Sequence, residues 1–203
     1  MLDMVMNSTD IALIVAAYLI GSIPTGVIVA RVTGARDPRT LGSGNIGATN
    51  VGRAAGKGAG IVTLVGDGLK GALPTAAALF FASSPLAVGV TAFAAFFGHL
   101  FPLFLRFRGG KGVATALGLF LVISPVATLG AVLIFVLLLI VWRYVSLGSI
   151  VAAASMPVLL ALLPSSRAFA PLGVVVGAMV IVKHGDNIRR LVAGRENRLG
   201  GKK

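Results

Sequence analysis

Residues 126–142 read VATLGAVLIFVLLLIVW, an apolar run that contains no charged residue. Ser124 and Pro125 precede this run and Arg143 follows it. A helix that crosses the hydrocarbon core of a bilayer needs roughly 17 to 25 mostly apolar residues. The run therefore predicts a membrane-spanning helix.

Six further apolar segments lie along the chain, bounded by charged residues, by Ser-Pro or by glycine: residues 11–32, 61–82, 86–105, 113–123, 147–163 and 169–182. As a helix, the segment 113–123 is only about 16 Å long, at about 1.5 Å per residue, so it cannot cross a bilayer alone. We therefore expect an all-α, polytopic membrane protein with seven transmembrane helices. The fourth of these is expected to be a short half-crossing.

The composition points the same way. Of the 203 residues, 57% are hydrophobic and 12% are charged, whereas about a quarter of the residues of a soluble domain are charged. Seven crossings with short connections would use up the chain, so we expect a single integral-membrane domain over residues 1–203. The segment 11–32 is too long for a signal peptide and follows Asp3 and Asp10 rather than a basic region, so we expect it to be retained. Cysteine is absent, which excludes a disulfide, a thiolate zinc site and a cysteine-bound acyl intermediate.

The formal net charge is +12, which in a soluble protein would suggest nucleic acid as a partner. The placement of the charge argues against that partner. If the seven segments alternate across the membrane, every Lys and Arg except Arg167 falls on one side. Basic residues gather on the cytoplasmic side of membrane proteins. We therefore expect an N-terminus outside, a cytoplasmic C-terminus and no nucleic-acid partner.

Residues 42–50 read GSGNIGATN, and Arg53 follows them. Glycines at this spacing allow successive backbone N–H groups to point into one concavity that suits a phosphate. Four side chains add hydrogen-bonding groups: Ser43, Asn45, Thr49 and Asn50. A flexible cytoplasmic loop is the alternative. A nucleotide P-loop is excluded, because the motif lacks the Lys-Ser/Thr ending and follows a membrane helix rather than a strand.

Residues 106–112 read RFRGGKG and lead into the short segment 113–123. At this position the Lys111 ammonium and the N–H groups of a helix N-terminus could converge on one anion. The alternative is an anchor for the cytoplasmic side. We favour the anchor for Arg106 and a ligand contact for Lys111. We interpret His99, in the preceding segment, as structural.

Two other polar groups leave alternatives open. Asp67 and Lys70 lie three residues apart, so they form either a self-satisfied ion pair or a functional pair close to the membrane. Ser146 and Ser149 follow the run at 126–142, and either serine could contact a ligand or cap the next helix.

Residues 184–191 read HGDNIRRL. On a continuing helix, His184, Asn187 and Leu191 share one face. His184 is the candidate for proton transfer near neutral pH. For the arginines of this region, binding of anionic lipid headgroups is an alternative: Arg189, Arg190, Arg195 and Arg198.

Three motifs in this order closely resemble the bacterial acyl-phosphate-dependent glycerol-3-phosphate acyltransferases, the PlsY family: residues 42–50, GGKGVAT at 109–115, and His184-x-x-Asn187-Ile188-x-Arg190-Leu191. The resemblance spans nearly the whole chain, although Arg108 stands where the family often has lysine. It implies transfer of a fatty acyl group from acyl phosphate to the 1-hydroxyl of glycerol 3-phosphate, which yields lysophosphatidate and phosphate. It also implies a multi-pass protein of the bacterial inner membrane, surrounded by lipid, with a cytoplasmic active site. An upstream enzyme would supply the acyl phosphate.

With this resemblance, we expect the acyl phosphate to bind the first motif, at Gly42, Ser43, Gly44, Asn45, Gly47, Thr49 and Asn50. The resemblance assigns glycerol 3-phosphate to Arg53, Lys111, Ser146, His184 and Asn187. Of these, Lys111, His184 and Asn187 are the expected catalytic residues. The donor is already activated, so direct transfer needs no enzyme nucleophile. The proton of the attacking hydroxyl passes either to the leaving phosphate or to His184.

The sequence shows no clustered carboxylates, so we expect no metal and no cofactor. A His-x-x-x-x-Asp signature is also absent, which weighs against acyl-CoA as the donor. The competing function is a small organic-anion transporter or channel. Transport would require polar positions that continue to the outer side, where Arg167 and two serines are nearly the only ones. A lipid-binding scaffold would explain the basic tail but not the glycine-rich loops.

Overall fold

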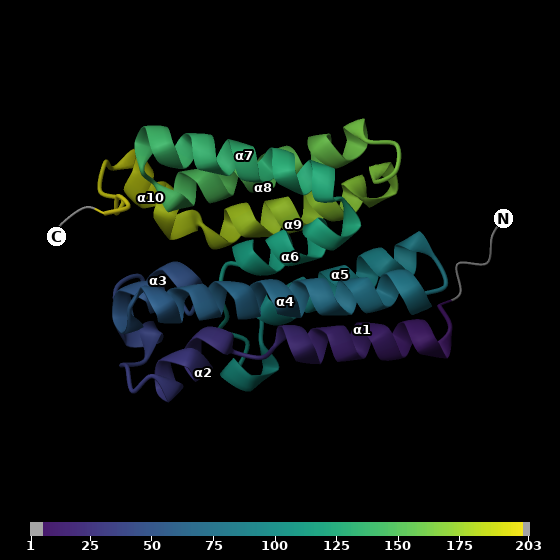
Figure 1. The fold of residues 1–203 in the computed structure, drawn as a ribbon, viewed down its shortest axis with the longest axis horizontal. Coiled ribbons are helices and arrows are strands. Elements are labelled where there is room, and N and C mark those ends of the chain that lie inside the picture. Colours follow the sequence, from purple (N-terminus) through teal and green to yellow (C-terminus); the bar gives the residue numbers. More distant parts are fainter. Residues whose placement is uncertain (1–5, 201–203) are drawn as a thin grey trace. The chain divides into compact units, whose positions relative to one another are not determined.

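The computed structural model describes residues 6–200, and within that range the chain forms helices and no strand (Figure 1). The described α-helices are, in order, α1 (Ser8–Gly21), α2 (Thr25–Val32), α3 (Ala48–Ala55), α4 (Lys57–Phe81), α5 (Pro85–Leu100), α6 (Val113–Ile123), α7 (Pro125–Trp142), α8 (Val145–Leu162), α9 (Ala170–Lys183) and α10 (Gly185–Val192). Three short 3-10 helices lie between them, at Pro38–Thr40, Leu103–Leu105 and Arg167–Phe169. The chain divides into two compact units, Met1–Val122 and Ile123–Lys203.

All seven apolar segments of the sequence are helical in the structure. The short fourth segment is α6, whose bounds are Val113–Ile123, as the sequence predicts. The prediction of one continuous helix at 11–32 is wrong, because α1 ends at Gly21 and α2 begins at Thr25. Pro24 lies in this break. Its missing N–H and its ring disfavour a helix through this point.

In the first unit, α1, α4 and α5 pack side by side, and α2 and α3 both contact α4. Glycines make the close approaches possible. A Cβ atom added to Gly21 would collide with the backbone of Ala95, and one added to Gly118 would collide with the backbone of Gly68. Small residues at helix contacts are typical of membrane helix packing, where backbones approach closely.

In the second unit, α8 packs against both α7 and α9, and α10 contacts α8 and α9. The chain bends by 60° between α9 and α10. The sequence-based expectation of a continuing helix through residue 184 is therefore wrong. His184 has φ −94° and ψ 10°, ends α9 and begins α10.

Among the described residues, four stretches are long and apolar enough to cross a membrane: Ser8–Val32, Pro85–Leu105, Pro125–Trp142 and Val145–Leu162. The bent pair Arg167–Lys183 and Gly185–Val192 counts as a fifth if it forms one span. The longer helix α4, which contains Asp67 and Lys70, and the short α6 are not among them. Seven crossings and the orientation of the termini stay predictions. Lys202 and Lys203, which belong to the predicted basic face, lie outside the described residues.

Candidate active site

The first loop, residues 38–50, is organised around the side chain of Asn50, which is 3% exposed. Its amide nitrogen donates to the carbonyl oxygens of Pro38 (2.7 Å), Leu41 (3.0 Å) and Asn45 (2.8 Å). Its amide oxygen accepts from the backbone N–H of Ser43 at 3.1 Å. A buried amide with this many partners fixes the path of the loop, because leaving any of the groups unpaired would cost about 1–3 kcal/mol.

Gly42 and Gly44 form the turn of this loop, with φ values of 57° and 67°. A Cβ atom added to Gly42 would collide with the Asn50 side chain, so both the backbone conformation and the space require glycine there. The Asn45 amide oxygen accepts from the N–H of Gly47 at 2.8 Å, and α3 begins directly after Gly47. The loop therefore leads into a helix N-terminus, which attracts anions.

The acyl-phosphate residues predicted from the sequence thus differ in placement. Ser43 is exposed in the loop, and Thr49 is exposed in the first turn of α3. Arg53, which was predicted to bind glycerol 3-phosphate, is exposed on the same helix. Asn45 and Asn50 direct their side chains to the backbone of the loop. The side chains of Ser43 and Thr49 are thus open to solvent, whereas the side chain of Asn50 holds the loop together.

On the expectation that acyl phosphate binds this loop, Asn50→Asp should raise the KM for acyl phosphate about tenfold. A carboxylate cannot donate to the carbonyls of Pro38, Leu41 and Asn45, so the loop loses its internal support. Steady-state kinetics with varied acyl phosphate measures the change. Thr40→Val is the matched control in the same loop, because it removes only an exposed bond from the Thr40 hydroxyl to the Asp37 carbonyl. Equal KM values for Asn50→Asp and the control would contradict this role.

Lys111 lies in a second loop, residues 109–112, that is bonded to the end of α5. The N–H of Gly109 donates to the carbonyl of Leu100 at 3.2 Å, and the N–H of Gly110 donates to the carbonyl of His99 at 3.1 Å. Gly112 has φ 82°, and its carbonyl accepts from the N–H of Ala116 in the first turn of α6. The half-buried Lys111 is therefore fixed at the N-terminus of α6, as the sequence predicts.

Asp67 and Lys70 form a buried ion pair on α4, with the carboxylate oxygen 2.9 Å from the ammonium. Lys70 also donates to the carbonyl of Ile23, in the break between α1 and α2, at 2.9 Å. The self-satisfied pair left open by the sequence is therefore present.

In the second unit, the carboxylate of Glu196 gathers two of the predicted site residues. Its Oε1 accepts from the Ser146 hydroxyl at 3.0 Å and from the Asn187 amide at 2.7 Å. Its Oε2 accepts from the Arg190 guanidinium at 2.7 Å. The Ser146 hydroxyl thus belongs to this cluster, whereas the Ser149 hydroxyl donates to the carbonyl of Val145 in its own helix.

His184 lies three residues before Asn187, at the bend between α9 and α10, and is buried. Its Nδ1 lies 2.8 Å from the carbonyl oxygen of Val180. A carbonyl can only accept, so this contact places a proton on Nδ1. In the neutral imidazole the lone pair is then on Nε2.

The sequence-based interpretation missed Glu196. The one available signal in the sequence is the negative charge of Glu196, because this residue lies in an otherwise basic run with Arg195 and Arg198. Burial raises the pKa of the Glu196 carboxyl, but hydrogen bonds from Arg190, Asn187 and Ser146 outweigh burial and hold that pKa below its ordinary value. The carboxylate contributes stability above its unfolded pKa. That contribution is lost as the pH falls through the lower pKa of the folded state. Because both pKa values lie well below 7, the Glu196 carboxylate is ionised at neutral pH.

Glu196→Gln is expected to lower kcat/KM for glycerol 3-phosphate about tenfold. The carboxylate accepts hydrogen bonds from Ser146, Asn187 and Arg190. In glutamine an NH2 group replaces one carboxylate oxygen, so at least one of these donors loses its acceptor. An unsatisfied buried group costs about 1–3 kcal/mol. Initial rates with varied glycerol 3-phosphate check the expectation. The control is Arg195→Gln, an exposed neighbour in the same tail. A Glu196→Gln variant with unchanged kcat/KM would show that Ser146 and Asn187 do not depend on the carboxylate.

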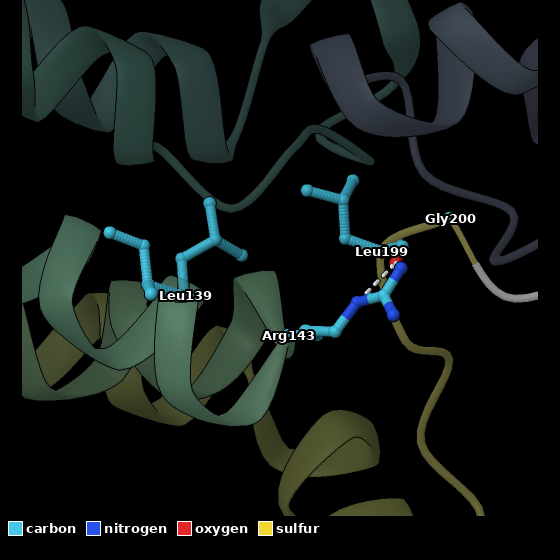
Figure 2. Close-up of a pocket in the computed structure, with 5 residues that line it drawn as sticks. Leu139, Arg143, Leu199 and Gly200 are labelled. Atoms are coloured by element: carbon cyan, nitrogen blue, oxygen red, sulfur yellow. Dashed lines mark hydrogen bonds between the residues drawn. The ribbon is translucent and has the colours of Figure 1, made fainter.

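The tail after Glu196 also bonds to the end of α7. Figure 2 shows the guanidinium of Arg143 beside Leu199, to whose carbonyl its Nε (3.2 Å) and an NH2 group (2.8 Å) donate. A pocket of about 390 Å³ lies here, lined by Leu139, Ile140, Arg143, Leu199 and Gly200. It contains none of the site residues predicted from the sequence.

Comparison with known proteins identifies the family. A family model described as "Glycerol-3-phosphate acyltransferase" matches residues 11–194. The glycerol-3-phosphate acyltransferase of Syntrophotalea carbinolica is 54% identical over 187 residues, which cover 92% of this chain and 95% of that protein. The corresponding protein of Geotalea daltonii is 53% identical over 190 residues, which cover 94% of this chain and 97% of that protein.

A solved structure of PlsY, described as an integral membrane glycerol 3-phosphate acyltransferase in its glycerol 3-phosphate form, has a TM-score of 0.90 to this chain. It is 40% identical in sequence, and the match covers 95% of this chain and 96% of that one. The lysophosphatidic acid form of PlsY has a TM-score of 0.88 at 39% identity. The three motifs, the helical fold and these matches agree, and the chain belongs to the glycerol-3-phosphate acyltransferase family.

Proposed function

We propose that this protein transfers a fatty acyl group from acyl phosphate to the 1-hydroxyl of glycerol 3-phosphate. The products are lysophosphatidate and phosphate, in the first acylation step of phospholipid synthesis. The observation that carries the proposal is the match over nearly the whole chain to a protein solved in glycerol 3-phosphate and lysophosphatidic acid forms.

The first loop is proposed to bind the acyl phosphate. Its glycine turn, the exposed Ser43 and Thr49 hydroxyls and the N-terminus of α3 together provide donors for one phosphate. As the anhydride bond breaks, negative charge grows on the leaving phosphate. Donors that are already in place stabilise this charge without reorganisation. The internal hydrogen bonds of Asn50 keep the loop in that arrangement.

Glycerol 3-phosphate is proposed to bind through Arg53, Lys111, Ser146, His184 and Asn187. Arg53 and Lys111 supply positive charge for its phosphate, and the other three supply hydrogen-bonding groups. The hydroxyl oxygen attacks the acyl carbonyl carbon and forms the ester bond, while the bond from that carbon to the phosphate oxygen breaks and its electron pair leaves with the phosphate. The proton of the hydroxyl passes to His184 or to the leaving phosphate. Holding two substrates in attack geometry contributes about 7–11 kcal/mol.

We also propose the membrane in which the protein lies and its orientation in that membrane. The chain would cross the bacterial inner membrane seven times as a single domain of residues 1–203, with its N-terminus outside and its C-terminus in the cytoplasm. The positions of the basic residues support this orientation. The active site would then lie at the cytoplasmic face, within reach of acyl phosphate from an upstream enzyme.

The test is a reconstituted assay. The purified protein in lipid vesicles is incubated with glycerol 3-phosphate and either acyl phosphate or acyl-CoA, and lysophosphatidate is measured by mass spectrometry. We expect product from acyl phosphate. Product from acyl-CoA alone would overturn the donor assignment. No product from either donor, with uptake of glycerol 3-phosphate into the vesicles, would favour the transporter.

A further inference from the structure

Three buried polar side chains of the first unit are not used by the proposed chemistry. Asp67 and Lys70 lie on α4 and His99 lies near the end of α5, and all three are at most 5% exposed. The Asp67 carboxylate oxygen is 2.9 Å from the Lys70 ammonium and 3.6 Å from Nδ1 of His99. The Asp67 carboxylate therefore faces groups from two helices.

Lys70 fixes one side of this cluster. Besides its ion pair with Asp67, its ammonium donates to the carbonyl of Ile23, in the break of the first span. The same carbonyl also accepts from the backbone N–H of Thr25 at 3.0 Å. The Lys70 ammonium therefore contacts the backbone of the break and the Asp67 carboxylate at the same time. Neither partner can move without leaving a buried charge unpaired, which is strongly destabilising.

His99 forms the other side and contacts the second loop directly. Its carbonyl accepts from the N–H of Gly110, so the loop is bonded to the backbone of this residue. Its imidazole ring lies against Gly110 so closely that a Cβ atom added to Gly110 would collide with Nε2. The next residue is Lys111. One ring thus touches the cluster on α4 through Nδ1 and the second loop through Nε2.

We infer that His99, held in orientation by Asp67 and Lys70, is a positioning residue that presents Lys111 to the phosphate of glycerol 3-phosphate. Lys70 contacts the break at Ile23 and the Asp67 carboxylate, which faces the His99 imidazole. The imidazole in turn contacts the second loop at Gly110. The inference rests on the proposed function, because it takes Lys111 as a ligand of that substrate. It assigns a positioning role to three residues that are not among the proposed substrate ligands.

A double-mutant cycle tests the inference through the contact between the imidazole and Gly110. His99→Ala is expected to raise the KM for glycerol 3-phosphate about tenfold and to leave the KM for acyl phosphate within about twofold. Gly110→Ala is expected to raise the same KM at least as much, because the new methyl group collides with the ring. In the double variant the ring is absent. The combined KM should therefore be about tenfold lower than the product of the two single effects.

Gly109→Ala provides the matched control. A Cβ atom at Gly109 would collide with the backbone carbonyls of His99 and Leu100 and with the ring of Pro102, none of which His99→Ala removes. The increases in the KM for glycerol 3-phosphate caused by Gly109→Ala and by His99→Ala should therefore multiply in the double variant. Thr75→Val serves as a second control, because it removes a buried hydroxyl of α4 that bonds only to the Gly71 carbonyl of the same helix. It should leave both KM values within about twofold.

The yield of folded protein and the thermal midpoint of each variant are measured beside the kinetics. If His99→Ala does not fold, His99→Gln, which lacks the ring, replaces it in the cycle. An unchanged KM for glycerol 3-phosphate in the folded His99 variant would overturn the inference. It would also be overturned if the increases in KM from the His99 and Gly110 substitutions simply multiplied in the double variant. A failure of the proposed function is distinguishable, because the unmodified protein would then make no lysophosphatidate.

Discussion

Lys111→Met is expected to lower kcat/KM for glycerol 3-phosphate by about 10²–10³-fold. This is the typical loss when one preorganised donor to a charged group is removed from an active site. Methionine keeps most of the length and apolar character of the side chain. The loop should fold unchanged, because Gly109 and Gly110 bond to the carbonyls of α5 through backbone N–H groups. The substitution therefore removes the ammonium group and leaves these backbone hydrogen bonds in place.

The measurement for Lys111→Met is the initial rate over a range of glycerol 3-phosphate at saturating acyl phosphate. Arg106→Gln is the control, because Arg106 is an exposed cation of the same connection, interpreted as an anchor. It should stay within about twofold of the unmodified protein. If both variants lose activity equally, general positive charge rather than Lys111 attracts the substrate, and the assigned role is wrong.

His184→Ala is expected to lower kcat/KM by about 10²-fold or more, within the range of 10²–10⁴-fold that general acid–base catalysis contributes. The contact of Nδ1 with the Val180 carbonyl gives the neutral imidazole a lone pair on Nε2, which is the form a base requires. The division of the loss between kcat and KM distinguishes the two possible proton acceptors.

A fall in kcat at saturating substrate would show that His184 accepts the proton of the attacking hydroxyl. A rise in KM with nearly normal kcat would show that His184 binds the substrate and that the leaving phosphate takes the proton. Asp186→Asn is the control from the same short helix, because Asp186 forms only an exposed ion pair with Arg189. It should leave kcat and KM unchanged within about twofold. If His184→Ala changes neither parameter, both roles are excluded.

The helices were predictable because apolar runs of membrane length are a strong signal. The bounds of α6 could be inferred from the glycines and Lys111 before it and from Ser124-Pro125 after it. The break at Pro24 was missed, because the apolar run at 11–32 is long enough to be interpreted as one crossing helix. The short helix α3 was not predicted, since eight residues give little periodicity to recognise. For α10 the sequence analysis considered a continuing helix and missed the bend that separates it from α9.

The candidate site was predictable as motifs but not as contacts. The glycine spacing indicated a phosphate loop, yet nothing in the sequence showed that the Asn50 side chain serves the backbone of the loop. Glu196 was missed because its partners lie up to 50 residues away, at Ser146. Asp67 and Lys70 were interpreted as a pair by themselves, so the contact of His99 with Asp67 was missed. That contact depends on how α4 and α5 pack. Long-range contacts of this kind follow from packing rather than from local pattern.

In the proposed mechanism both phosphate-bearing substrates are bound at the same time, and the acyl group passes directly between them. The most direct test measures initial rates while both substrates are varied. Direct transfer predicts double-reciprocal lines that intersect, and no acyl group on the protein after acid quench with labelled acyl phosphate. Parallel lines together with labelled protein in the absence of glycerol 3-phosphate would contradict the claim, because they would reveal a covalent acyl-enzyme intermediate.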